Sequence, residues 1–406
     1  MALTHWRHNA QRMLASHKAE AVTVSITEEN LVSYDLEGRF LGSYDQGVNI
    51  RRGLDNTFQQ RWRTAGPAQL RQRNLTGDEA QGIVQERRRK VAALLNDEQM
   101  AQVYPETAEV LRRIAGYTYE RLSNSGRDFI RIYGHIPILP PDQYRALVVQ
   151  ATDGCSYNRC TFCTLYRDKS YRVRSPEDFQ RHIQEVLDFT GDGLSYRNSL
   201  FLGDANAVAV PTERLLALMD ILQATAAFNS LLASRGIHAF LDMYTGVRKS
   251  VEEYRQLCEH GLRRVSLGIE TGSEALLALV EKPGTRQDVL ELVRGLKEAG
   301  IAVVVIFMIG LGGHRFREEH LAESAMLLQS LPLGKGDLVY LSRFAPHPAA
   351  PYLQRRDSDD LLPFDEETML AGITSQSPLA ISRSSCSGPQ PAYPRVNRNS
   401  SGPCPS

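Results

Sequence analysis

The sequence has little cysteine, with 6 in 406 residues, and no excess of charge, because 47 basic residues balance 47 acidic ones. Zero net charge excludes a global electrostatic field that would favour nucleic acid or an anionic membrane surface. It has no apolar run long enough to span a bilayer, and its first residues lack a signal-peptide pattern. We therefore expect no membrane partner and a water-soluble chain of about two or three domain-sized units.

Half of these few cysteines fall within nine positions, as Cys155, Cys160 and Cys163 in a C-x4-C-x2-C pattern. Three thiolates on one short loop can hold three irons of a cubane [4Fe–4S] cluster. No fourth protein ligand is evident nearby, so the fourth iron would stay open. Because an open iron can bind a small molecule, the pattern favours a chemical site over a structural one.

Two alternatives to the cluster stay open at this point. A closed zinc site needs four ligands, usually in two pairs. His135 and His182 lack finger-like spacing from the triplet, although folding could bring one of them near. The other alternative is a chance arrangement, which the scarcity of cysteine disfavours. The remaining cysteines form no second cluster before the C-terminal tail, so we expect no auxiliary iron–sulfur centre.

The cysteine loop is expected between a strand and a helix. Residues 146–152 are apolar and rich in β-branched side chains, which indicates a buried strand. Ser175 is a typical helix cap, and Pro176 fits the first helical position. The same order then recurs along the chain. Further strands are expected at 199–202, 237–243, 264–269, 302–309 and 337–344, with helices at 211–222, 251–261, 286–300 and 318–331.

Six strands with helical crossovers predict a parallel sheet covered by helices, which is an α/β fold. Two-sided burial explains why the strands are apolar throughout. A parallel barrel, or part of one, places its chemistry at the carboxyl ends of its strands. The cysteine loop leaves such an end.

At these strand ends the chain resembles the radical S-adenosylmethionine (radical SAM) superfamily. Phe162 holds the aromatic position before the last cysteine, although the first cysteine gap is one residue longer than the common C-x3-C-x2-C. Short motifs that resemble SAM-contacting segments of the family follow the second, fourth and fifth strands. The cofactor-binding residues that the resemblance implies are Phe162, Gly203, Asp204, Gly268, Glu270, Ser273 and Gly310.

The resemblance implies a partial (β/α)6 barrel with a [4Fe–4S] cluster and SAM as cofactors. It further implies reductive cleavage of SAM to a 5′-deoxyadenosyl radical that acts on an unidentified substrate, with an electron donor such as flavodoxin or ferredoxin. An oxygen-labile cluster and free thiols fit a reducing cytoplasm. The alternative function is a non-catalytic iron–sulfur or zinc protein. Individual residues also have simpler interpretations: turn glycines, a turn acid at Asp204, or a bridge from Glu270 to Arg263 or Arg264.

The first 135 residues are predicted to form a small α+β region. Alternation at 21–26 and 30–44 indicates antiparallel strands, and residues 76–96 and 106–123 fit helices. The arginine-rich stretch 51–73 permits RNA or phosphate binding, but we favour a solvated, partly helical surface.

The rest of the predicted domain plan follows from composition. Residues 136–145 form a linker, 146–345 the barrel and 346–370 an extension. Residues 371–406 are dominated by Ser, Pro, Gly, Asn and Arg, and we expect a disordered tail that contributes nothing to the cluster.

Overall fold

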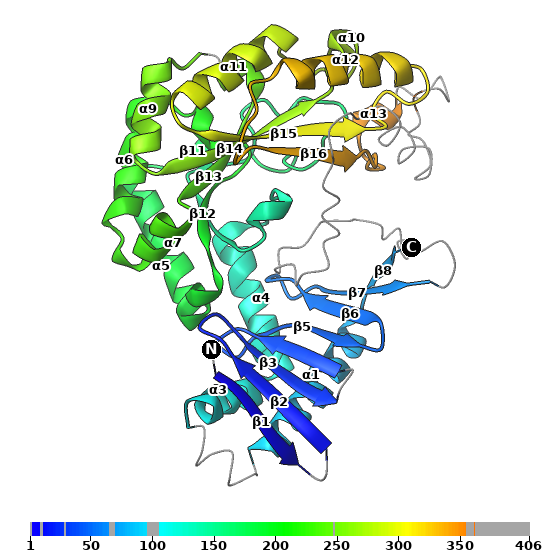
Figure 1. Cartoon of the computed structure of the whole chain (residues 1–406), viewed down its shortest axis with the longest axis vertical. Coiled ribbons are helices and arrows are strands. Elements are labelled where there is room, and N and C mark those ends of the chain that lie inside the picture. Colours follow the sequence, from blue (N-terminus) through cyan, green and yellow to red (C-terminus); the bar gives the residue numbers. More distant parts are fainter. Residues whose placement is uncertain are drawn as a thin grey trace, which may run out of the picture. The chain divides into compact units, whose positions relative to one another are not determined.

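The computed structural model describes residues 2–8, 11–27, 30–64, 70–95, 105–246, 248–354 and 361 (Figure 1). The described residues fall into two compact units. The first takes the described part of Met1–Leu147 together with His182–Asn198, and the second takes Val148–Arg181 with the described part of Ser199–Ser387. The predicted tail, with Cys386 and Cys404, lies outside the described residues, so the expectation about it stays a prediction.

The first unit is built on an eight-stranded antiparallel sheet whose strands follow one another in chain order. Its strands are β1 (Ala2–His8), β2 (Gln11–His17), β3 (Val22–Thr27), β4 (Asn30–Tyr34), β5 (Phe40–Asp45), β6 (Val48–Arg52), β7 (Phe58–Arg63) and β8 (Leu70–Asn74). Alternation along a strand places every second side chain on one face. One face therefore gathers Val22, Val24, Val32, Phe40 and Phe58 into a buried core.

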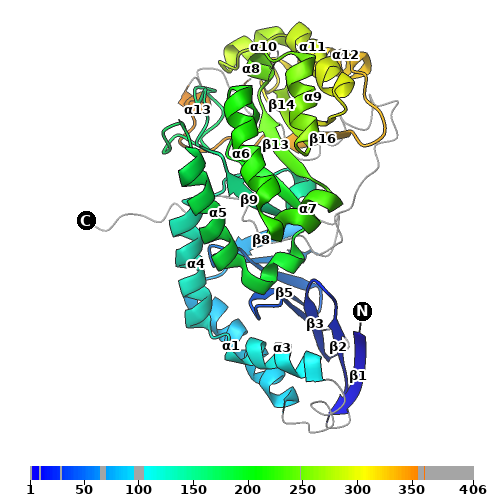
Figure 2. The ribbon, with the colours of Figure 1, turned by 90° about the vertical axis from the view of Figure 1, so that its left-hand side faces the viewer.

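Helices cover that apolar face. They are α1 (Gly77–Leu94) and α3 (Pro105–Gly116), followed by α4 (Tyr119–Tyr133). Val84 of α1 and Leu111 of α3 are buried in the same core as the sheet residues, and Figure 2 shows both helices along the sheet. α1 begins with a capping box, in which Thr76 and Glu79 each satisfy a backbone N–H of the other.

Two details of the N-terminal prediction were wrong. The arginine-rich stretch is not helical but forms β6, β7 and β8, because its alternation places Arg52 and Phe58 on the buried face. Buried Arg52 is satisfied by Asn56 Oδ1 at 2.8 Å and the carbonyl of Leu122 at 3.1 Å. The expected helix 106–123 is two helices, α3 and α4, because Thr118 caps the amino end of α4 and separates it from α3.

A six-stranded sheet carries the rest of the fold, and the predicted parallel sheet of six strands with helical crossovers is confirmed. Its strands are β9 (Ala146–Gln150), β12 (Ser199–Gly203), β13 (Ile237–Leu241), β14 (Leu262–Glu270), β15 (Ala302–Ile309) and β16 (Leu338–Arg343). They follow one another across the sheet in chain order, and β9 and β16 are its edges. The sheet is therefore a partial (β/α)6 barrel.

Helices connect successive strands of this sheet (Figure 1). The longer ones are α5 (Pro176–Thr190), α6 (Thr212–Ala224), α9 (Val251–Glu259), α11 (Arg286–Glu298) and α12 (Arg317–Ser330). The shorter ones are α7 (Asn229–Ser234), α8 (Met243–Gly246), α10 (Glu274–Leu279) and α13 (Pro351–Gln354), with 3-10 turns η1 (Pro141–Gln143), η2 (Gly191–Tyr196), η3 (Ala207–Ala209) and η4 (Ala226–Phe228). Every residue of β9 and β12 is buried, as two-sided packing requires.

No helix in the described ranges is by itself long and apolar enough to cross a membrane. Within these ranges, only the bent pair Thr212–Ala224 and Ala226–Ser234 has the necessary length and composition when the two helices are taken together.

Candidate functional site

The three cysteines lie on one loop at the carboxyl end of β9. A small antiparallel pair, β10 (Thr152–Asp153) and β11 (Arg172–Val173), closes the base of this loop. Two backbone hydrogen bonds fix the centre of the loop. Thr161 N–H donates to the carbonyl of Val280, and the carbonyl of Thr161 accepts from Tyr352 N–H, both at 3.0 Å. The Tyr157 hydroxyl donates to the carbonyl of Glu281 at 2.7 Å. The loop is thereby held against the end of α10 and the start of α13.

Hydrogen bonds inside the loop fix the backbone around the three cysteines. Asn158 takes a left-handed conformation with φ of 51°, which Asn tolerates better than most residues. Its amide side chain donates to the carbonyl of Tyr166 at 2.7 Å, and its N–H contacts Cys155 Sγ at 3.4 Å. Arg167 donates to the carbonyls of Cys160 at 2.9 Å and Cys163 at 3.2 Å. All three cysteines are free thiols and partly exposed.

The thiols fit an iron–sulfur cluster by their chemistry. Burial raises the pKa of Cys160 to about 11, with Lys282 acting against the rise, and burial also raises the pKa of Cys163. Because thiolates are the ligands of Fe–S clusters, binding must displace these protons. Cys155 acts electrostatically on both Cys160 and Cys163, and Cys163 acts on Cys160, so the three thiols share one neighbourhood.

The arrangement differs from a single-ion site. Within the described part of the chain, no group of three or more His, Cys, Asp or Glu side chains is placed to hold one metal ion. In a cubane cluster each cysteine binds a different iron, so the three sulfurs need not converge on a common point.

Phe162 lies between the last two cysteines and packs away from them into a small core. Its ring is 6.5 Å from that of Phe344 at an edge-to-face angle of 84°. Leu276 and Leu311, from α10 and the end of β15, belong to the same core. The aromatic side chain therefore anchors the cysteine loop to α10 and to the ends of β15 and β16.

Asp204, at the end of β12 after Gly203, holds the start of the cysteine loop. One carboxylate oxygen accepts from Gln150 Nε2 at 2.8 Å, and the other accepts from Gly154 N–H at 3.0 Å and Lys169 Nζ at 3.1 Å. Burial raises the pKa of Asp204, although Lys169 and the hydrogen bonds oppose the rise. The sequence indicated Asp204, but Gln150 and Lys169 had no recognisable signal.

A polar pair next to Asp204 was also missed. Asn206 Nδ2 donates to Ser156 Oγ in the cysteine loop at 2.9 Å, and Asn206 Oδ1 accepts from Asp242 N–H at 3.0 Å. Asp242 follows β13. Their positions directly after two parallel strands were the one signal that could have found them.

Glu270 ends β14 with a left-handed φ of 66°, at a break in the pairing register with β15. Its carboxylate pairs with Lys282 Nζ at 3.0 Å, and both side chains are nearly buried. The expected alternative partners, Arg263 and Arg264, are therefore not its partners. Gly268 leaves room for this pair, because a Cβ there would lie 2.8 Å from Glu270 Oε1.

Ser273 occupies a different environment from the other candidates. It is fully buried and caps α10, with its hydroxyl accepting from Leu276 N–H at 3.0 Å and donating to Glu319. Nearby, His320 of α12 hydrogen-bonds Thr271 Oγ1 at 2.7 Å. These contacts attach α12 to the turn after β14.

Gly310 follows β15 with φ of 90°, a conformation that favours glycine. The next turn is fixed by Gly312 N–H, which donates to the Tyr352 hydroxyl at 3.1 Å. The structure thus places Asp204, Glu270 and Gly310 at the carboxyl ends of β12, β14 and β15 in the same sheet. Asp204 contacts the cysteine loop directly, and Glu270 contacts Lys282. Ser273 lies apart as a helix cap.

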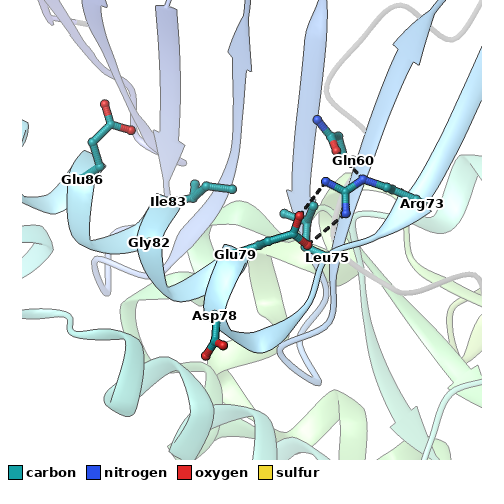
Figure 3. Close-up of a pocket in the computed structure, with 8 residues that line it drawn as sticks. All are labelled: Gln60, Arg73, Leu75, Asp78, Glu79, Gly82, Ile83 and Glu86. Carbon is teal, nitrogen blue, oxygen red and sulfur yellow. Dashed lines mark hydrogen bonds and ion pairs between the residues drawn. The ribbon is translucent and has the colours of Figure 1, made fainter.

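A pocket in the first unit is separate from this cluster of residues (Figure 3). It lies between β7, β8 and the start of α1, and its lining includes Gln60, Arg73 and Glu79. Arg73 pairs with Glu79 at 2.8 Å, and this contact lowers the pKa of Glu79 to about 2. Glu79 is thus engaged both by Arg73 and by the backbone N–H of Thr76 in the helix cap.

Comparison with known proteins agrees with the geometry. Residues 149–325 match the family model of the radical SAM superfamily. An uncharacterized protein from Methanopyrus kandleri is 28% identical over 202 residues, which are 48% of this chain and 36% of that protein. The tRNA-2-methylthio-N(6)-dimethylallyladenosine synthase of Desulforamulus reducens is 26% identical over 201 residues, 48% of this chain and 41% of that one. The matches span about two fifths of these curated relatives.

A solved structure resembles the chain more loosely. Coproporphyrinogen III oxidase (HemN) from Escherichia coli, a radical SAM enzyme, has a TM-score of 0.43 and 17% identity, covering 61% of this chain and 54% of that one.

The family match contains the whole cysteine loop and the ends of β12, β14 and β15. The family model therefore matches the same part of the chain in which the motifs indicated a resemblance to the radical SAM superfamily. Members of this superfamily are enzymes that use a [4Fe–4S] cluster and SAM.

Proposed function

We propose that this protein is a radical SAM enzyme in which Cys155, Cys160 and Cys163 hold one [4Fe–4S] cluster. The observation that carries the proposal is the position of three free thiols on one fixed loop at the carboxyl end of a parallel strand. Three ligands leave one iron for a small molecule, and the family match supports SAM as that molecule. The chemistry supplied by the bound cofactors is one-electron cleavage of a SAM carbon–sulfur bond, which yields a 5′-deoxyadenosyl radical.

The protein's own residues position these cofactors. Asp204 and Lys169 hold the first turn of the cysteine loop, and the packing of Phe162 holds its last turn. We propose that SAM lies across the strand ends marked by Asp204, Glu270 and Gly310, where Gly203, Gly268 and Gly310 let backbone approach a ligand closely. Ser273 is left out of this contact set, because its hydroxyl is buried and engaged by Leu276 and Glu319.

The proposal includes an external electron donor of the flavodoxin or ferredoxin class and a reducing, cytoplasmic environment. Free thiols and an oxygen-labile cluster are stable only where oxygen and oxidants are kept low. The substrate of the radical is left unassigned.

The test is anaerobic reconstitution with iron and sulfide, followed by a SAM-cleavage assay with dithionite. The wild-type protein should form a brown cluster and release 5′-deoxyadenosine. Cys160→Ala should lose both, because two thiolates cannot retain the cluster. Cys258→Ala is the matched control: Cys258 is another free cysteine, on α9, and its loss should change neither reading.

Two results would contradict the proposal. If Cys160→Ala keeps the iron content of the wild-type protein, Cys160 is not a ligand of the cluster. A stable cluster in the wild-type protein without SAM cleavage would favour the alternative function, a non-catalytic iron–sulfur protein.

A further inference from the structure

A buried ion pair lies beside the cysteine loop. Lys282 Nζ and Glu270 Oε1 are 3.0 Å apart, and their side chains are 12% and 10% exposed. The two residues before Lys282 are attached to the loop, through Thr161 N–H to Val280 and the Tyr157 hydroxyl to Glu281. Lys282 Nζ itself lies 6.0 Å from the ring centroid of Phe162, the residue before Cys163. The cation is therefore fixed next to the proposed cluster ligands.

The lysine is the member of the pair with a contact to the cysteine loop, because its Nζ lies 6.0 Å from the ring centroid of Phe162. Glu270 lies over Gly268, where a Cβ would be 2.8 Å from Glu270 Oε1 and 3.3 Å from Lys282 Nζ. Glu270 therefore holds the ammonium group of Lys282 beside the loop that carries the cysteines.

A buried ion pair contributes little net stability to a fold. Desolvation of two buried charges roughly cancels their attraction, so apolar replacements are often as stable. A fixed charge in a low-dielectric site does, however, act strongly on other charges nearby. A thiolate-ligated iron–sulfur cluster is such a group, and its reduction potential depends on charge and hydrogen bonding around it.

We propose that Lys282, held in place by Glu270, is a positioning residue that raises the reduction potential of the cluster bound by Cys155, Cys160 and Cys163. The inference rests on the proposed function, since it requires that cluster. Reduction adds one electron from an external donor of the ferredoxin or flavodoxin class and breaks no bond. The cluster becomes more negative by one charge, and the fixed cation stabilises that state relative to the oxidised one.

The experiment is an anaerobic redox titration of the reconstituted full-length protein without SAM, followed by electron paramagnetic resonance. Lys282→Met should reduce the ratio of reduced to oxidised cluster, at a fixed potential, about tenfold, which is 59 mV for a one-electron couple. Glu270→Gln should shift the midpoint in the opposite direction, because it removes the negative end of the pair. Lys282→Arg keeps the charge and should stay near wild type.

Two further variants separate this effect from damage to the fold. The double variant Lys282→Met/Glu270→Gln leaves no buried unpaired charge, and its midpoint should fall less than that of Lys282→Met alone. Lys297→Met breaks another ion pair, with buried Asp337 at 2.6 Å, before the amino end of β16. It should leave the midpoint unchanged.

The outcomes distinguish the two proposals. If the wild-type protein forms no cluster, the proposed function fails before the potential is measured. If the cluster forms and Lys282→Met leaves its midpoint at the wild-type value, or if Lys282→Met and Glu270→Gln shift it in the same direction, the role of Lys282 is overturned while the cluster assignment stands.

Discussion

Asp204 is a buried carboxylate with three donors, and two of them belong to the cysteine loop. Its contacts with Gly154 N–H and Lys169 Nζ join the loop's first and later turns to the end of β12. Other hydrogen bonds near Cys155, from Asn206 to Ser156 Oγ and from Asn158 N–H to Cys155 Sγ, restrain the same part of the loop. At the residue scale, Asp204 therefore contributes, together with these bonds, to how the cysteines are arranged before any metal binds.

Replacing Asp204 with Asn should lower both stability and iron retention. Lys169 would be left nearly buried without its carboxylate, and loss of one partner of a buried pair costs about 3–5 kcal/mol. Chemical denaturation would measure the free energy of unfolding, and iron per chain would be measured after reconstitution. The double variant Asp204→Asn/Lys169→Met should recover part of the loss, since it removes both charges. Additive losses in the double variant would show that the pair is not coupled.

His320 gives the fold a pH dependence. It is buried, and burial lowers its pKa to about 4. In the unfolded chain a histidine titrates near 6.5, so between these values the unfolded state binds a proton that the folded state does not. The folded state should therefore lose about 3 kcal/mol as pH falls from 6.5 to 4. Above pH 6.5 the residue should have no effect.

Denaturant titrations at several pH values would measure how the free energy of unfolding depends on pH through His320. His320→Gln should show a shallower decline over the same window, because Gln does not titrate. An identical pH profile in the two proteins would assign acid sensitivity to other groups, such as the paired carboxylates.

Sequence reasoning reached some of these residues and not others. The cysteines were found because their spacing is local, and Asp204 and Glu270 because they directly follow strands. Lys169 and Lys282 were missed because their ion-pair partners are distant in the sequence. Lys169 pairs with a carboxylate 35 positions away, and Lys282 pairs with one 12 positions away. A lone lysine in a sequence gives no sign that it will be buried.

At the scale of elements, the turn after β14 and helix α12 fit together through a glycine. A Cβ on Gly272 would lie 2.3 Å from the carbonyl oxygen of Glu323 and 2.7 Å from the backbone nitrogen of Ser324, both in α12. Backbone atoms of a helix cannot move individually. The approach of α12 to the strand end therefore depends on the absence of a side chain.

Gly272→Ala should destabilise the protein by about 1–3 kcal/mol through overpacking. Gly295→Ala is the matched control: Gly295 lies inside α11, and its Cβ would meet only Val251 at an ordinary 3.8 Å. That change should stabilise the protein by about 0.5–1 kcal/mol, because Ala is the better helix former. Thermal unfolding of the two variants would measure these opposite changes in stability. Equal effects of the two substitutions would contradict the packing argument.

The elements of the parallel sheet were the easiest to predict. β15 matches its predicted bounds, and the helices begin and end within two residues of expectation where caps such as Ser250 mark them. The broken helix at Thr118 was missed because its apolar spacing continues across the cap. The short strands β10 and β11 were missed because two residues leave no periodic pattern.

At the scale of the whole molecule, the two units differ in how far the sequence predicts them. The parallel sheet repeats one strand–helix pattern, so each unit of the pattern supports the next. The antiparallel sheet of the first unit has short strands with many polar side chains, such as the arginines of β6 to β8. Alternation indicated its strands within 21–44, but the strands at 48–74 were missed, since burial of Arg52 depends on Asn56 and the distant Leu122.

The central claim is that three cysteines hold a cluster with one open iron that binds SAM. Mössbauer spectroscopy of the anaerobically reconstituted, ⁵⁷Fe-labelled protein tests it most directly. We predict one [4Fe–4S] cluster per chain, in which addition of SAM changes the isomer shift of a single iron site and leaves the other three as they were. A spectrum that SAM leaves unchanged, or an iron content below that of one cluster per chain, would contradict the account.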